Sequence, residues 1–581
     1  MRQRGASELD HLNTPHGSRL VDLLVDEERA AEIHLASREW RSVDLGPRQL
    51  CDLELLINGA FSPLDRYLGS ADHQSVCADM RLSDGVLWPI PVTLNITTKL
   101  ADDLAIGDSL ALRDREGVMI AAMRIDECYQ RDIDAEVAAV FGTTDRSHDG
   151  VAQYLHRTGE WSVAGSLEAL QLPVHYDYRE LRRRPIAVRR LFSTLGWENV
   201  IAYQTHRAIH RAQQAMMVEA AQITDAKILI HAVVGLDQPG DADHYTRIRC
   251  YQAAVAKFPK DMVRLNLLPM AIRGGGVREA LLHAIVHKNY GCSHLMIDFD
   301  SFGTVLETVG EPAYRQEDAI EIVGSHAEDL GIELLPTREM VYLEGRQQFV
   351  AVDEVPADDR ALHLKASEVK QRLDDGIELP GWYTHEEVSK ELQDRHPRRG
   401  EQGFTVFLTG LSGSGKSTIA NVLRVKLLEI GGRGVSLLDG DLVRANLSSE
   451  LGFSKEHRDL NIRRIGFVAS EITRGGGVAI CAPIAPYDVV RREVREMVQS
   501  CGGFVLVHVA TPLEVCEARD RKGMYAKARA GIIKEFTGIS DPYEMPHDAD
   551  VVIDTSALTP EDATREVLLY LQSEGYINGA Q

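Results

Sequence analysis

The sequence lacks the features of secreted or membrane-inserted chains. No apolar run approaches the about 18 residues that a membrane-spanning helix needs, and the segment Met1–Arg19 is polar rather than signal-like. The eight cysteines are scattered without CxxC spacing, so we expect buried, reduced thiols and no disulfide framework. We therefore expect a cytoplasmic protein.

The chain also has no excess of positive charge. Its 64 Lys and Arg residues are outnumbered by 87 Asp and Glu residues, which gives a formal net charge of −23. Nucleic acids and membrane surfaces bind a summed positive field, so neither is an expected partner. Small anions can still bind where backbone amides and a few Arg or Lys side chains converge.

The length and the pattern of apolar residues indicate a multi-domain α/β protein. The 581 residues exceed the usual size of one domain, and 44% of them are hydrophobic. Residues 1–172 hold short apolar runs between Pro and Gly turns, such as Trp88–Ile96, which indicates a β-rich domain.

Two further domains are predicted after the first. Residues 173–396 alternate strand-like runs, such as Lys227–Val234 and His294–Ile297, with helical ones such as Arg278–Tyr290. This alternation is typical of a parallel α/β sheet. The charged segment Gln393–Gln402 indicates a linker, and strands and helices alternate again over residues 397–581.

A nucleotide-binding loop follows the linker. The apolar run Phe404–Thr409 precedes Gly410-Leu-Ser-Gly-Ser-Gly-Lys416-Ser417, which fits G-x-x-x-x-G-K-S between a strand and a helix. The glycines let backbone amides turn towards a polyphosphate, and the helix N-terminus adds favourable partial charge. We expect Lys416 to reach the β- and γ-phosphates and Ser417 to bind Mg²⁺.

Two carboxylates are expected beside this loop. Asp439 and Asp441 follow the strand that ends at Leu437-Leu438, and ligands of open α/β sheets bind at that edge. Such carboxylates hold hydrated Mg²⁺ or accept the proton of an attacking hydroxyl. A helix N-cap is an alternative role for Asp441 that is compatible with the first.

Four segments follow these carboxylates or include them: Asp439–Arg444 (D-G-D-x-x-R), Leu451–Ser454 (L-G-F-S), Asn461–Gly466 (N-I-R-R-I-G) and Lys527–Ile539. Together they resemble adenylylsulfate (APS) kinase, which converts APS and ATP into PAPS and ADP. The resemblance spans the whole C-terminal region and implies a P-loop kinase fold with a parallel sheet. A generic ATPase or another small-molecule kinase would explain the P-loop but not these segments.

The resemblance also implies site residues. Lys416, Asp439 and Asp441 are the expected catalytic residues, and Ser417 and Asp439 the expected Mg²⁺ ligands. The implied ATP-binding residues are Gly410, Ser412, Gly413, Ser414, Gly415, Lys416, Ser417, Thr418 and Arg519. The implied APS-binding residues are Arg444, Phe453, Arg458, Asn461, Ile484, Lys522 and Phe536. Phe453 and Phe536 would stack around the APS adenine, and residues 522–527 would lie on a mobile lid.

One departure from the kinase family limits the mechanism. The family usually has serine in its S-P-Y segment, where this chain has Ala485-Pro-Tyr487. A covalent step on that serine is therefore impossible here. Direct in-line transfer does not require it.

The first 395 residues resemble ATP sulfurylase, which makes APS and pyrophosphate from ATP and sulfate. The matching segments are Pro47–Leu56, Gly59–Asp65, Trp88–Val92, Gly240-Asp241, Tyr245–Arg249, Arg278–Ala280 and Lys288–Gly291. The resemblance implies a PUA-like β-rich domain followed by a Rossmann-like nucleotidyltransferase domain, and a homo-oligomer. The implied sulfurylase-type site residues are Gln204, Thr205, His206, Arg207, His210, Asp300 and Val341.

The sulfurylase motifs are altered. The family's Q-T-R-N-P-x-H-x-x-H reads Gln204–Gln213 here with His206 in place of the arginine, and G-R-D-H-A-G reads Asp298–Gly303 with Phe299 in place of the other arginine. A histidine with a pKa of ~6.5 is mostly neutral at pH 7, whereas a guanidinium stays charged and forks onto oxyanions. We therefore expect sulfurylase activity to be weak or absent.

Several interpretations stay open from the sequence. The sulfurylase region is a poorly active enzyme, a fully active one, or a pseudoenzyme that assembles subunits or senses nucleotide. The kinase region is a working kinase or an allosteric PAPS-binding module; the intact Gly410–Ser417 loop, Asp439 and Asp441 argue against the module. A metal pair at His206 and His210 is not expected, because no third ligand accompanies them.

Overall fold

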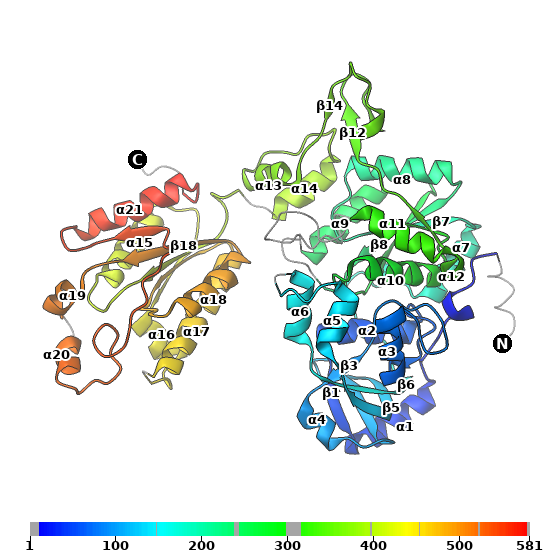
Figure 1. Ribbon diagram of the computed structural model, residues 1–581. Helices are drawn as coiled ribbons and strands as arrows, with labels where there is room; N and C mark the ends of the chain where they lie inside the picture. Colours follow the sequence, from blue (N-terminus) through cyan, green and yellow to red (C-terminus); the bar gives the residue numbers. More distant parts are fainter. Residues whose placement is uncertain are drawn as a thin grey trace. The chain divides into compact units, whose positions relative to one another are not determined.

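A computed structural model describes residues 11–146, 148–236, 243–297, 315–395, 398–452, 454–520 and 523–577 (Figure 1). The chain divides into two compact units, and each is described by itself. The first unit combines residues 1–365 with 379–395, and the second combines 366–378 with 396–581.

The first unit begins with a mixed, mainly antiparallel sheet of order β1–β4–β5–β6–β2, in which β3 also pairs with β6. Only β1 and β4 pair in parallel. The strands are β1 (Arg41–Asp44), β2 (Arg66–Tyr67), β3 (Leu94–Ile96), β4 (Ser109–Arg113), β5 (Met119–Gln130) and β6 (Trp161–Ala169). The helices are α1 (Glu27–Ala36), α2 (Pro47–Asn58), α3 (Ser70–Asp79), α4 (Thr98–Asp103), α5 (Ile133–Phe141) and α6 (Asp149–Arg157).

The predicted apolar run Trp88–Ile96 forms a strand only over its last three residues. Pro89 and Pro91 lack the N–H that a strand donates to its neighbour, so the first part of the run packs as irregular chain. Trp88 is nevertheless fully buried, and its indole N–H donates to the carbonyl of Ile90 at 2.8 Å.

A parallel sheet of order β11–β10–β7–β8–β9 follows, as the alternating pattern predicts. Its strands are β7 (Val200–Thr205), β8 (Lys227–Val233), β9 (Val263–Leu268), β10 (His294–Ile297) and β11 (Glu333–Leu335). Its helices are α7 (Pro185–Leu195), α8 (Arg211–Ile223), α9 (His244–Val255), α10 (Gly276–Asn289), α11 (Gln316–Ser325) and α12 (Ala327–Leu330). The unit ends with an antiparallel sheet of β12 (Met340–Leu343), β13 (Gln348–Ala351) and β14 (Ala361–Leu362), and with α14 (Glu386–Arg395).

The first two of the three sheets of the first unit share one hydrophobic core. This core runs from Leu12 to Ile332 and includes the buried side chains of α10. Nearly every residue of α10 is buried, which requires apolar neighbours on all of its sides. The domain boundary expected at residues 172/173 thus falls inside one compact unit, and it stays a prediction.

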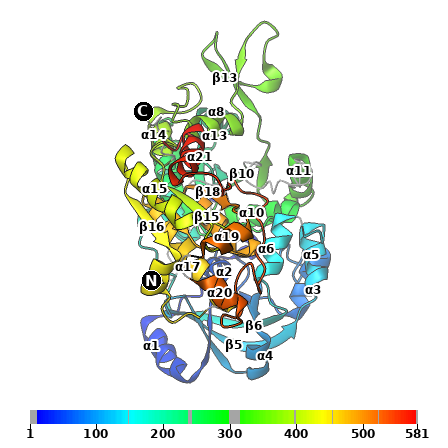
Figure 2. The same cartoon turned by 90° about the vertical axis from the view of Figure 1, so that its left-hand side faces the viewer.

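The second unit is a five-stranded parallel sheet of order β16–β17–β15–β18–β19. The strands are β15 (Phe404–Thr409), β16 (Val435–Asp439), β17 (Val478–Ala482), β18 (Gly503–Val509) and β19 (Val551–Ile553). The helices are α13 (Ala366–Asp374), α15 (Lys416–Ile430), α16 (Gly440–Leu447), α17 (Lys455–Arg474), α18 (Asp488–Gln499), α19 (Leu513–Arg519), α20 (Met524–Arg529) and α21 (Pro560–Ser573). Helices α15 and α21 pack together on one face of the sheet, and α17 and α18 on the other (Figures 1 and 2).

The connection between the units differs from the expected linker. Helix α14 continues to Arg395, so the first residues of the predicted Gln393–Gln402 linker are helical. Residues 366–378, which precede α14, cluster with the second unit. The sequence pattern contains no signal for this exchange of segments.

Glycine 466 sets how closely α17 approaches α18. A Cβ at this position would lie 2.6 Å from Cγ2 of Val494, inside the closest distance that packed carbon atoms tolerate. The close crossing positions α17, whose first turns carry Arg458 and Asn461.

We expect Gly466→Ala to destabilise the second unit by about 1–2 kcal/mol, because crowding outweighs the better helix propensity of alanine. The double variant Gly466→Ala/Val494→Ala should show a favourable coupling of about 1 kcal/mol, since the shorter side chain makes room. Urea unfolding followed by far-UV circular dichroism measures this. The first unit contains all five tryptophans, which are Trp40, Trp88, Trp161, Trp197 and Trp382. Tryptophan fluorescence therefore follows the unfolding of the first unit, and its transition should stay unchanged in both variants as the control. A gain in stability for Gly466→Ala alone would contradict the expectation.

Candidate functional site

The Gly410–Ser417 loop lies between β15 and α15, at the carboxyl edge of the sheet of the second unit. Gly410 has φ 150° and Gly413 has φ 77°, and a Cβ would lie 2.5 Å from the carbonyl oxygen of Val509 or 3.0 Å from that of Cys516. Glycine is required at both positions because the backbone passes so close to its neighbours. The Oγ of Ser414 is buried and has no hydrogen-bond partner among the described residues.

Two threonines hold the loop from beneath. The hydroxyls of Thr511 and Thr555 donate to the carbonyl of Ser414 at 3.1 and 2.9 Å. Arg519, expected near the ATP adenine, donates to the hydroxyl and the carbonyl of Thr555 at 2.8 and 2.7 Å. Neither threonine could be predicted from the sequence, because neither belongs to a recognised motif.

The predicted catalytic residues of the loop converge. Lys416 Nζ donates to the carbonyls of Gly410 and Leu411 at 2.9 and 2.7 Å, so the ammonium lies within the loop. The Ser417 hydroxyl donates to Asp439 Oδ2 at 2.6 Å, although β17 lies between β15 and β16 in the sheet. A hydroxyl and a carboxylate oxygen are hard ligands that suit Mg²⁺, which takes its other ligands from water and phosphate.

Other predicted residues of this edge are placed as follows. Thr418 is exposed in the first turn of α15, and the Ser412 carbonyl accepts from the Tyr525 hydroxyl at 2.8 Å. Asp441 is the second residue of α16, but its side chain is not among those that the structure describes. Phe453 and Lys522 lie outside the described residues.

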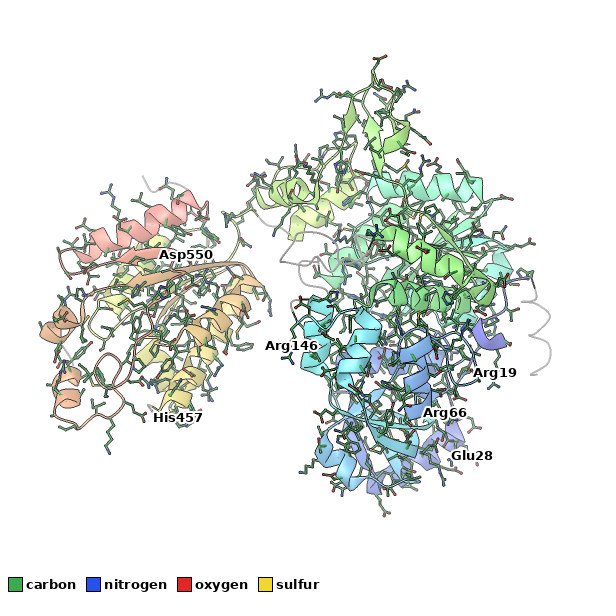
Figure 3. All side chains as sticks on the ribbon, in the orientation of Figure 1. Arg19, Glu28, Arg66, Arg146, His457 and Asp550 are labelled. Atoms are coloured by element: carbon green, nitrogen blue, oxygen red, sulfur yellow. The ribbon has the colours of Figure 1, made fainter. Side chains whose placement is uncertain are left out.

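The loop before residue 453 is held by two side chains. Arg444 Nη1 donates to the carbonyls of Leu451 and Gly452 at 3.3 and 3.0 Å. His457, labelled in Figure 3, accepts from the Gly452 N–H at 2.9 Å.

Arg458 and Asn461 lie one turn apart on α17 and carry buried polar atoms without partners. Arg458 Nε and Asn461 Oδ1 have no hydrogen-bond partner among the described residues, and Asn461 is 4% exposed. Burying such atoms unpaired costs free energy, so a cluster of them indicates a surface built for a polar ligand.

Phe536 lies close to this surface but is packed inwards. Its ring meets the Tyr525 ring edge-on, with centroids 5.1 Å apart, in a cluster with Cys516 and Ala528. Its predicted stacking on the APS adenine stays a prediction.

The segment that lacks the family's serine has a strained backbone. Ala485 is buried and has φ 47°, a left-handed conformation that is unfavourable for alanine. Its carbonyl accepts from Arg491 Nη1 at 2.8 Å, and the carbonyl of Ile484 accepts from the Thr409 hydroxyl at 2.6 Å. These contacts hold the two carbonyls of the segment in place.

The sulfurylase-type residues Gln204 to His210 span the end of β7 and the loop after it, also at the carboxyl edge of a parallel sheet. Gln204 is buried and hydrogen-bonds His283 of α10, and the Thr205 hydroxyl accepts from the backbone N–H of Arg207 at 3.0 Å. His210 precedes the first turn of α8, and its Nδ1 lies 3.0 Å from the Thr384 hydroxyl. These side chains are engaged with the protein itself.

The two histidines are held neutral. Burial, with Arg207 and Arg247 nearby, lowers the pKa of His206 to about 4, and burial lowers the pKa of His210 to about 4. Neither therefore supplies positive charge at pH 7. They do not share a helix face either, since His206 lies in the loop before α8.

Two sulfurylase-type predictions remain, Asp300 and Val341, and the structure describes only Val341. Val341 is buried in β12, which packs on α8. Asp300, the Asp298–Gly303 segment and Gly240-Asp241 lie outside the described residues. Arg247, which donates to the His206 carbonyl at 3.1 Å, was quoted in a motif but not proposed for the site.

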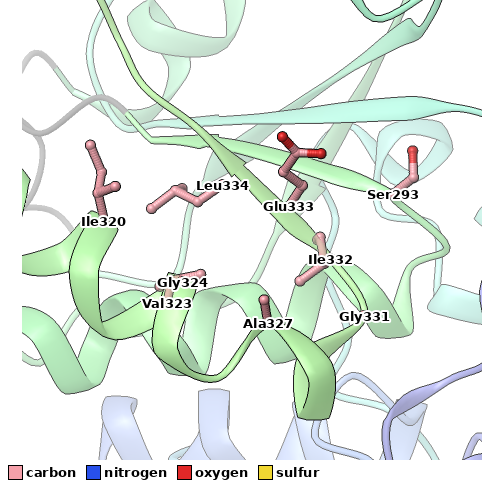
Figure 4. A pocket seen from close by; sticks show the side chains of 9 residues that line it. All are labelled: Ser293, Ile320, Val323, Gly324, Ala327, Gly331, Ile332, Glu333 and Leu334. Carbon is pink, nitrogen blue, oxygen red and sulfur yellow. The ribbon is translucent and has the colours of Figure 1, made fainter.

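A cavity of about 470 Å³ lies elsewhere in the first unit (Figure 4). Its lining includes Ile320, Val323, Leu334, Ser293 and Glu333, and only the last two side chains carry oxygen. It adjoins the beginnings of β10 and β11, opposite the strand ends where ligands of parallel sheets bind. It is therefore not the candidate site.

Comparisons with known proteins follow the same order along the chain. Family models match for a PUA-like domain over residues 13–172, ATP-sulfurylase over 179–395 and adenylylsulphate kinase over 402–554. The sulfate adenylyltransferase of Phaeosphaeria nodorum is 46% identical over 570 residues, covering 97% of this chain and 99% of that protein. The chain belongs to the family of fused ATP sulfurylases and APS kinases.

Further relatives span the whole chain. The sulfate adenylyltransferase of Mycosarcoma maydis is 44% identical and covers 97% of this chain and 100% of its own. A solved structure described as a hexameric APS kinase from Thiobacillus denitrificans is 37% identical, with a TM-score of 0.79, covering 98% of this chain and all of that one. The sulfurylase and kinase regions and the α/β fold class are thus confirmed.

None of the described helices is long and apolar enough to cross a membrane. No group of three His, Cys, Asp or Glu side chains in the described ranges is arranged to hold a metal ion.

The depressed pKa of His206 predicts a pH-dependent stability. The unfolded histidine binds a proton near pH 6.5 but the folded one only near pH 4, so stability present above pH 6.5 is lost as the pH falls towards 4. At pH 5 the loss amounts to about 2 kcal/mol. We expect His206→Asn to reduce the difference in unfolding free energy between pH 7 and pH 5 by this amount.

Tryptophan fluorescence in urea reports this unfolding. The matched control is His34→Asn, because His34 is exposed on α1 of the same unit. An equal pH dependence in wild type and His206→Asn would show that His206 is not held neutral by burial.

Proposed function

We propose that the second unit is an active APS kinase, which transfers the γ-phosphoryl group of ATP to the 3′-hydroxyl of APS and releases PAPS and ADP. The observation that carries the proposal is the convergence at one sheet edge of Lys416, the Ser417–Asp439 pair and the unpartnered polar atoms of Arg458 and Asn461. Lys416, Ser417 and Asp439 are suited to a nucleoside triphosphate, and Arg458 and Asn461 to a polar acceptor.

The chain's own residues account for the transfer. The loop amides and Lys416 bind the β- and γ-phosphates, and Ser417 with Asp439 would hold Mg²⁺, which neutralises phosphate charge when bound. The 3′-oxygen bonds to the γ-phosphorus while the bond to the β,γ-bridging oxygen breaks. We assign Asp439 or Asp441 to take the hydroxyl proton. No phosphorylated side chain is needed, and Ala485 offers none.

We further propose that the sulfurylase region turns over weakly or not at all. His206 and His210 are neutral, and Gln204 is engaged by His283. An oxyanion site needs fixed charge and free donors, and loss of one such donor typically costs ~2.7–4 kcal/mol of transition-state stabilisation.

A fully active bifunctional enzyme is the second candidate. It is favoured by relatives with 44–46% identity over the whole chain that are named sulfate adenylyltransferase. An allosteric PAPS-binding module is less well supported, because the P-loop and the Ser417–Asp439 pair are intact. The solved hexameric relative supports a homo-oligomer, and we propose a cytoplasmic location.

Labelled sulfate distinguishes these candidates. The protein is given Mg·ATP, labelled sulfate and pyrophosphatase, and the label is followed into APS and PAPS, with a parallel reaction fed APS directly. We expect PAPS from APS and little or no label from sulfate. Efficient labelling of PAPS from sulfate would establish the bifunctional enzyme, and failure of the APS-fed reaction would reject the kinase.

Substitution of the P-loop lysine tests the kinase site. Lys416→Ala should lower kcat by at least about 100-fold, because it removes a cation that balances charge in the transition state. The control is Lys426→Ala: Lys426 lies on the same helix but is half-exposed and pairs with Glu429. Equal activities of the two variants would contradict the assignment.

A further inference from the structure

A carboxylate that no motif includes is bound to the candidate acceptor arginine. Asp541 Oδ2 lies 2.8 Å from Arg458 Nη1, and the side chains are 17% and 12% exposed. At this burial the pair is poorly screened by solvent. The guanidinium predicted to bind the anionic end of APS therefore already carries an anion from its own chain.

A tyrosine completes the arrangement. The Tyr487 hydroxyl donates to Asp541 Oδ2 at 2.7 Å and accepts from Arg458 Nη2 at 3.0 Å. Burial and the hydrogen bond to Asp541 raise the pKa of Tyr487 to about 12, so it stays a donor at neutral pH. The three side chains form a closed triangle.

Arg458 is also held without Asp541. Its Nη1 donates to the Thr537 hydroxyl at 2.9 Å, and the Tyr487 hydroxyl accepts from Nη2. Thr537 and Asp541 belong to one tight loop, in which the Gly538 N–H donates to the Asp541 carbonyl at 2.8 Å. Arg458 therefore keeps two hydrogen bonds that do not need the charge of Asp541.

The free side of Arg458 shows where a ligand approaches. Its Nε and the Oδ1 of Asn461 are the buried atoms without partners described above, and positions three apart on a helix share a face. A phosphosulfate group that reaches this face meets a guanidinium already neutralised by Asp541. Two anions on one guanidinium repel each other, so the carboxylate lowers the affinity for the second.

We propose that Asp541 is a positioning residue that sets the affinity of the acceptor site by competing with the acceptor's anionic group for Arg458. The inference rests on the proposed APS kinase function. In this proposal the Asp541 carboxylate, paired with Arg458, lowers the affinity of the site for its dianionic acceptor below the affinity that an unpaired Arg458 would give.

Steady-state kinetics with APS at saturating Mg·ATP tests the proposal. Asp541→Asn keeps the shape and an oxygen that accepts from Tyr487 but removes the charge, so KM for APS should fall by about tenfold with kcat changed less than about twofold. Asp541→Glu keeps the charge and should retain a KM near that of wild type. The matched control is Glu493→Gln. Glu493 on α18 lies 2.6 Å from Nε of Arg463, which is on α17 like Arg458, so this variant also removes the charge that pairs with an α17 arginine. It should leave KM for APS unchanged.

The opposite result is equally clear. A rise in KM for Asp541→Asn would show that the carboxylate orients Arg458 for the acceptor, and an unchanged KM would show that it does not affect binding; either overturns the proposal. If wild type does not convert APS, the proposed function fails separately. Calorimetric titration of APS into wild type and Asp541→Asn then decides the matter, with tighter binding by the variant expected and equal or weaker binding overturning the proposal.

Discussion

The P-loop of this chain depends on the carbonyl oxygen of Ser414. The hydroxyls of Thr511 and Thr555 donate to it and lie 2.8 Å from each other. A planar trans peptide directs its N–H opposite to its C=O, so a carbonyl drawn towards the sheet turns the following amide outwards. Because the threonines follow β18 and β19, the shape of the anion-binding loop relies on the order of three parallel strands.

At the carboxyl edge of the parallel sheet of the sulfurylase region, polar side chains are hydrogen-bonded differently from those of the kinase region. There two polar side chains at and beyond the end of β7 have partners within the protein: Gln204 hydrogen-bonds His283, and His210 hydrogen-bonds Thr384. These contacts support the proposal that the sulfurylase region turns over weakly, because a site for a dianion needs free donors and fixed positive charge. In the kinase region, by contrast, Ser414, Arg458 and Asn461 retain buried polar atoms without described partners. Between Gln204 and His210 on one side and Arg458 and Asn461 on the other, the contrast lies in hydrogen-bond satisfaction.

Much of the kinase site could be predicted from sequence because its parts are local. A glycine loop between a strand and a helix has one common geometry, and Asp439 could be placed at the sheet edge from the strand before it. The partners of these residues could not be predicted, since they are brought in by tertiary packing. Asp541 lies far along the chain from Arg458, and Thr384 is 174 positions from His210.

The fold shows the same division between local and distant information. Alternating runs predicted β8, β10, β15 and α10, whereas the prolines of Trp88–Ile96 shortened the expected strand to β3. Residues 366–378 carry no local signal for their place in the second unit, because that placement depends on contacts across the chain.

The shared core of the first unit has a consequence for taking the chain apart. A cut at residue 173 would remove apolar neighbours of α10 and expose apolar surface on both fragments, which favours aggregation. A cut at residue 397 would spare that core but leave residues 366–378 on the wrong fragment. The domain boundaries that sequence comparison suggests are thus not the positions at which the chain can be divided into fragments that each keep a complete core.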